Sequence, residues 1–175
     1  MSVSNSFMLV DWDKFCTEYK QHGESSFLVE LIDELDDYPN TNVIKNSWFE
    51  YLQLDSEIGS AIHTGMMYEQ VEEAKNNISK QEYNLLSEVI GILNVDLTGP
   101  YNDLDKGESE YWLYSSYGPT SVEDVKSRID ALSSSLDTFE ITQELKNSFK
   151  SYVNDIQGVF NKAATDKLGV LIAIG

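Results

Sequence analysis

Two short apolar runs, one near each end of the chain, constrain the fold more than any other feature of the sequence. Phe7–Val10 is apolar and stops at Asp11, and a run of five apolar residues lies between Gly169 and Gly175. Short apolar runs bounded by polar residues or glycine are typical of buried strands. The segments between them have helical patterns. We therefore predict an α+β fold, mostly helical, with a small sheet that contains residues 7–10 and 169–174.

Amphipathic patterns in the first half of the chain predict the first of about six helices. Asp11 is placed to cap a helix that carries Trp12 and Phe15 and ends at His22. Further helical patterns cover residues 25–37, 42–64 and 67–78. Ser79 and Glu82 then have the spacing of a capping box, in which each side chain bonds the other residue's backbone N–H. This box predicts a helix that begins at residue 80.

The second half predicts an irregular segment followed by two helices and the terminal strand. Residues 94–119 contain Gly-Pro turns and an aromatic run, Tyr111–Tyr117, suited to a strand or a packed loop. Thr120 and Glu123 have the spacing of a second capping box. The helix after them should bury Val122, Val125, Ile129 and Leu132. Thr142 should cap a long helix that buries Leu145, Phe149, Tyr152, Val153, Ile156, Val159 and Phe160. Because no segment has the composition of a linker, we predict one domain over residues 1–175.

Four stretches of the C-terminal third are similar to the YfbM-like family of uncharacterised bacterial proteins. They are Leu97–Gly99, Tyr117–Leu132, the long helix after Thr142 and the closing run to Gly175. The resemblance implies a turn, a capped helix, a long aromatic-rich helix and a hydrophobic terminal strand. It implies no activity and no catalytic residue.

The chain is strongly acidic, with 30 Asp and Glu residues against 12 Lys and Arg and a formal net charge of −18. Small soluble domains commonly carry a net charge of roughly 2–8 in magnitude. The excess is greatest in the first 90 residues, which hold 17 acids and five bases, and Arg128 is the only arginine. Such a charge attracts basic proteins and repels nucleic acid and anionic membranes.

We predict a partner-binding surface made of three acidic clusters and neighbouring aromatic residues. Its residues are Asp33, Glu34, Asp36 and Asp37; Glu69, Glu72 and Glu73; Asp103, Asp105, Glu108 and Glu110; and the aromatic Trp112 and Tyr114. Tyr and Trp often anchor protein interfaces. The alternative is that the acids line solvated helix faces and a solvated loop, and that the aromatic run packs in the core.

No motif in the sequence predicts a catalytic site, a metal site or a cofactor. A calcium loop starting at Asp103 fails, because its fifth and twelfth positions are Gly107 and Tyr114. His22 and His63 are far apart and have no further ligand at zinc spacing. Cys16 lies among aromatic residues, which indicates a core thiol rather than a nucleophile.

The sequence therefore favours a binding protein over an enzyme. The expected function is an acidic stoichiometric inhibitor of a basic protein, such as an immunity protein or antitoxin that neutralises a bacterial toxin. Two alternatives stay open: a phage-type nucleic-acid mimic, and a hydrolase that uses two carboxylates. The N-terminus has no signal-peptide pattern, no apolar run is long enough to span a membrane, and the single cysteine fits a reducing compartment. We expect a cytoplasmic protein.

Overall fold

The computed structural model describes residues 5–22, 52–53, 65–92, 103 and 114–174. The helix expected over residues 25–37 and most of the helical pattern over 42–64 lie outside these ranges. The described elements, in chain order, are β1 (Asn5–Val10), α1 (Trp12–His22), β2 (Leu52–Gln53), α3 (Gly65–Ala74), α4 (Lys80–Gly91), β3 (Tyr114–Tyr117), α5 (Pro119–Ser135), the 3-10 helix η2 (Leu136–Thr138), α6 (Gln143–Asp166) and β4 (Gly169–Ile174).

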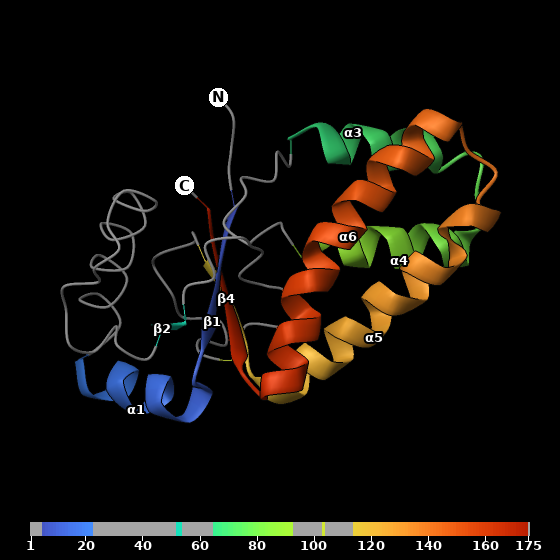
Figure 1. The fold of residues 1–175 in the computed structure, drawn as a ribbon. Coiled ribbons are helices and arrows are strands. Elements are labelled where there is room, and N and C mark those ends of the chain that lie inside the picture. The colour runs from blue at the N-terminus through green and yellow to red at the C-terminus, as the bar shows by residue number, and fades with distance from the viewer. Residues whose placement is uncertain (1–4, 23–51, 54–64, 93–102, 104–113, 175) are drawn as a thin grey trace.

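The strands form one antiparallel sheet in the order β2-β1-β4-β3. β1 and β4 lie side by side at its centre and pair along their whole length, from Asn5 opposite Ile174 to Val10 opposite Gly169 (Figure 1). The prediction that a small sheet contains residues near both chain ends is therefore confirmed. With five α-helices described around it, the fold is α+β and mostly helical.

Side chains alternate between the two faces of the sheet, and each face holds buried side chains. Phe7 and Leu9 of β1, with Val170 and Ile172 of β4, point into the main hydrophobic core. Val10 and Leu171 point to the opposite face, and neither is exposed to solvent. The Trp12 ring of α1 packs against Gly169 on this second face. α1 therefore helps to cover the side of the sheet away from the main core.

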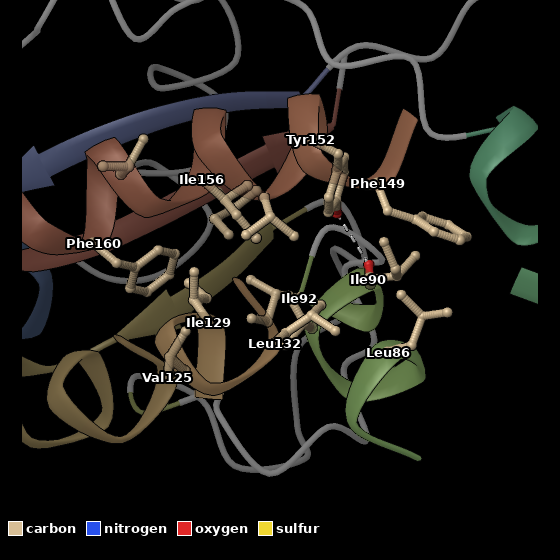
Figure 2. Packing of buried hydrophobic residues seen from close by; sticks show 14 of the residues in the cluster. Leu86, Ile90, Ile92, Val125, Ile129, Leu132, Phe149, Tyr152, Ile156 and Phe160 are labelled. Atoms are coloured by element: carbon tan, nitrogen blue, oxygen red, sulfur yellow. Dashed lines mark hydrogen bonds between the residues drawn. The ribbon is translucent and has the colours of Figure 1, made fainter. Parts of the chain in front are cut away.

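The main core lies between the sheet and the hairpin formed by α5 and α6 (Figures 1 and 2). All the residues expected on the inner faces of these two helices are buried. α4 closes the far end of this core with Leu86, Val89 and Ile90. Figure 2 shows the hydroxyl of Tyr152 in α6 directed at α4, where it donates a 3.3 Å hydrogen bond to the carbonyl oxygen of Ile90.

Three predicted helix caps are confirmed. An Asp11 carboxylate oxygen accepts a hydrogen bond from the backbone N–H of Lys14 at the start of α1. Ser79 and Glu82 form both bonds of the capping box before α4. The Thr142 hydroxyl accepts from the N–H of Leu145 at the start of α6. These side chains satisfy N–H groups that the first helical turn leaves without a partner.

The second predicted capping box is wrong. α5 begins at Pro119. Its N-cap residue is Gly118, which has no side chain to cap the helix. Proline is favoured at the first helical position because its φ is already helical and its missing N–H would have no helical acceptor. Thr120 and Glu123 therefore lie inside the helix and do not define its start.

Two other parts of the predicted helices also differ from the structure. Leu52 and Gln53, expected in a helix, form the short strand β2 and pair with Leu9 and Val10. The helix expected to reach residue 78 ends at Ala74, and the N–H of Asn77 bonds the Ala74 carbonyl in the turn that follows. Asparagine favours turns over helix interiors because its side chain competes for backbone hydrogen bonds.

Among the described residues, no helix combines the length and the apolar character that crossing a lipid bilayer requires.

Candidate partner-binding surface

Five of the predicted partner-binding residues are described: Glu69, Glu72, Glu73, Asp103 and Tyr114. The others lie outside the described ranges, and their role stays a prediction. They are Asp33, Glu34, Asp36, Asp37, Asp105, Glu108, Glu110 and Trp112.

The acidic cluster on α3 is exposed, as expected for a surface that meets a partner. Val71 and Ala74 are the buried residues of this stretch, so Glu69, Glu72 and Glu73 point to solvent. Glu69 and Glu73 are one helical turn apart and share a side of α3. Within the described part of the chain, neither carboxylate has a hydrogen-bond or ion-pair partner. Two negative charges are therefore displayed on one helical turn.

The third carboxylate of this cluster, that of Glu72, is held by its neighbours. One of its oxygens accepts a 2.7 Å hydrogen bond from the Tyr83 hydroxyl of α4, and the other lies 3.3 Å from the ammonium of Lys75. The Tyr83 hydrogen bond, followed by that from Lys75, holds the pKa of Glu72 below its ordinary value. The Lys75 ammonium also lies over the Tyr83 ring. Glu72 therefore fastens α3 to α4 and is less available to a partner.

The sequence reasoning also missed an exposed carboxylate, that of Glu144, on the helix that a hydrogen bond joins to α3. The Ser148 hydroxyl of α6 donates a 2.8 Å hydrogen bond to the Gln70 side-chain oxygen of α3. α3 accordingly lies beside the first turns of α6 in Figure 1. Glu144 is exposed and precedes Ser148 by one helical turn, on the same side of α6. No sequence signal relates Glu144 to α3, because the two helices are far apart in the chain.

We name Glu69, Glu73 and Glu144 the α3–α6 acidic surface. All three side chains are exposed, and none has an ion-pair partner in the described structure. They come from two helices that the Gln70–Ser148 hydrogen bond joins. The surface is therefore a product of the fold rather than of one acidic sequence run.

Most of the basic side chains in the described helices form ion pairs with the chain's own acids. The Arg128 guanidinium of α5 lies 2.7 Å from a Glu88 oxygen of α4 and 3.4 Å from an Asp124 oxygen. Lys126 pairs with Asp130, which also accepts a hydrogen bond from Gln157 of α6. These two donors, Lys126 first, hold the pKa of Asp130 below its ordinary value.

Two further lysines, both on α6, act in the same way. Lys150 pairs with Asp137 of η2, and Lys162 pairs with Asp166 within α6. The hydrogen bond to Lys150 is the main cause that holds the pKa of Asp137 below its ordinary value. Since these cations are already engaged, they do not neutralise the acids of the α3–α6 acidic surface.

Asp103 has a structural role that the sequence did not predict. Its carboxylate accepts a 2.6 Å hydrogen bond from the N–H of Gly118, and its own N–H donates to the carbonyl of Ser116. Asp103 thus fixes the start of α5 from a distant part of the chain. Tyr114 is the first residue of β3 and pairs with Ala173 of β4. Whether either residue also contacts a partner stays a prediction.

Tyr117, the last residue of the predicted aromatic run, is buried in the core. Its ring meets that of Phe160 edge-on, with 5.6 Å between the ring centroids, and its hydroxyl donates to the carbonyl of Ile92. At this position the aromatic run serves packing, which was one of the two interpretations of the sequence.

No group of three or more His, Cys, Asp and Glu side chains in the described ranges has the arrangement of a metal site. Cys16 is half-buried and lies next to the buried Phe15. Comparison of the chain with models of protein families, with curated proteins and with solved structures gave no match. The resemblance to the YfbM-like family is neither supported nor contradicted by these comparisons.

Proposed function

We propose that this protein is an acidic stoichiometric inhibitor that binds and blocks a basic protein, in the manner of an immunity protein or an antitoxin. The observation that carries this proposal is the α3–α6 acidic surface. It consists of exposed carboxylates from two helices, in a chain of net charge −18 whose described cations largely bind its own acids.

Electrostatics determines which class of protein such a surface attracts. Carboxylates without intramolecular cations attract Lys- and Arg-rich surfaces and accelerate their encounter with the inhibitor. A toxin that cuts or binds nucleic acid needs basic residues to hold phosphate groups. Glu69, Glu73 and Glu144 would pair with those basic residues and so exclude the substrate.

The first experiment identifies the partner. The full chain is immobilised and used to capture proteins from its native host, and the bound species are identified by mass spectrometry. Recovery of a basic protein in a one-to-one complex, together with loss of that protein's activity, supports the proposal. If the captured protein is a DNA- or RNA-binding protein rather than a toxin, and this chain displaces nucleic acid from it, the nucleic-acid mimic is favoured. Turnover of a small substrate by the isolated chain would instead support the hydrolase.

The second experiment tests the surface. Association of the captured protein is followed by stopped flow for the variants Glu69→Lys/Glu73→Lys and Glu123→Lys/Asp155→Lys. Both pairs change exposed acids and shift the net charge equally, but only the first pair lies in the α3–α6 acidic surface. We expect the first variant to associate severalfold more slowly than the second, and the difference to shrink at high salt. Equal rates would show that the partner binds elsewhere.

A further inference from the structure

We draw no further inference here: the strongest candidate, the unpaired carboxylates Glu69 and Glu73 on the exposed side of α3, belongs to the surface already proposed for the partner, and the buried Ser87 hydroxyl oxygen of α4, which has no hydrogen-bond partner in the described ranges, belongs to an only partly buried residue and marks no second site.

Discussion

The indole of Trp12 lies against the backbone of Gly169 and fills the space that a side chain at residue 169 would need. A Cβ built on Gly169 would overlap the six-membered ring of Trp12 and would lie 3.0 Å from the Tyr117 carbonyl oxygen. The same indole approaches Gly118, where a Cβ would lie 3.0 Å from a Trp12 ring carbon and 3.2 Å from an Asp103 oxygen. Two glycines thus let α1 dock where β4 and α5 begin.

We expect Gly169→Ala to destabilise the protein by about 1–3 kcal/mol, the usual cost of forcing extra atoms into a packed site. The new methyl group meets a ring on one side and a backbone carbonyl on the other. Urea unfolding measures the loss. The double variant Trp12→Ala/Gly169→Ala should lose less stability than the sum of the two single changes, because removing the indole removes the overlap. Additive losses would contradict the contact.

Gly158→Ala is the matched change at a glycine with open space around it. Gly158 lies inside α6, and a Cβ there would meet no atom within 4 Å. Glycine in a helix interior is less favourable than alanine by roughly 0.5–1 kcal/mol, because it loses more backbone freedom on folding. We therefore expect this variant to be more stable than the natural chain by that amount. A loss of stability in the same urea assay would be inconsistent with an unobstructed site.

Asp103→Ala should destabilise the fold although the residue belongs to a predicted acidic cluster. The change leaves the buried N–H of Gly118 without its acceptor, which typically costs about 1–3 kcal/mol. Asp103→Asn keeps a side-chain oxygen and should lose less. Thermal unfolding of the two variants separates this role from simple loss of charge. If both variants melt like the natural chain, the hydrogen bond does not hold the start of α5.

The contact between α3 and α4 should weaken in acid. The pKa of Glu72 lies below its ordinary value of 4.5, chiefly because of the Tyr83 hydrogen bond and then that of Lys75. A carboxyl group with a lowered pKa stabilises the fold above its unfolded pKa, and this contribution is lost as the pH falls through the folded pKa. Glu72→Gln should therefore be less stable than the natural chain at neutral pH, and the difference should disappear well below pH 4.5.

Urea unfolding at a series of pH values tests this expectation. Glu69→Gln is the control, because it removes a charge from the same helix without breaking a described hydrogen bond. Asp130 and Asp137 contribute a pH dependence of the same sign, so the prediction concerns the difference between variants. A constant difference between Glu72→Gln and the natural chain across this range would argue against the Glu72 contact.

Features set by neighbouring residues could be predicted from the sequence. The capping box of Ser79 and Glu82 needs only a three-residue spacing, and the inner faces of α5 and α6 follow from the helical repeat. The start of α5 was misplaced because Pro119 and the distant Asp103 together replace a local cap. That second contribution joins residues 15 positions apart and leaves no local pattern.

The candidate surface was predictable only in part for the same reason. The acidic residues of α3 can be read from the sequence. The hydrogen bond that engages the Glu72 carboxylate, however, comes from Tyr83 in another helix. The place of Glu144 depends on how α6 packs against α3. The strand β2 could not be predicted either. It has only two residues, and they form a strand because they pair with β1. Tertiary contacts decided each of these features.

The pairing of β1 with β4 also has a consequence for biosynthesis. The ribosome releases β1 early, whereas residues 169–174 emerge only after the described helices have been made. Until then β1 lacks its full-length neighbour and exposes backbone groups and apolar side chains that favour association with other chains. The described helices can form from local hydrogen bonds during translation, but the central β1–β4 pair of the sheet forms last. A nascent chain stalled before residue 169 would therefore be the species most in need of chaperone protection.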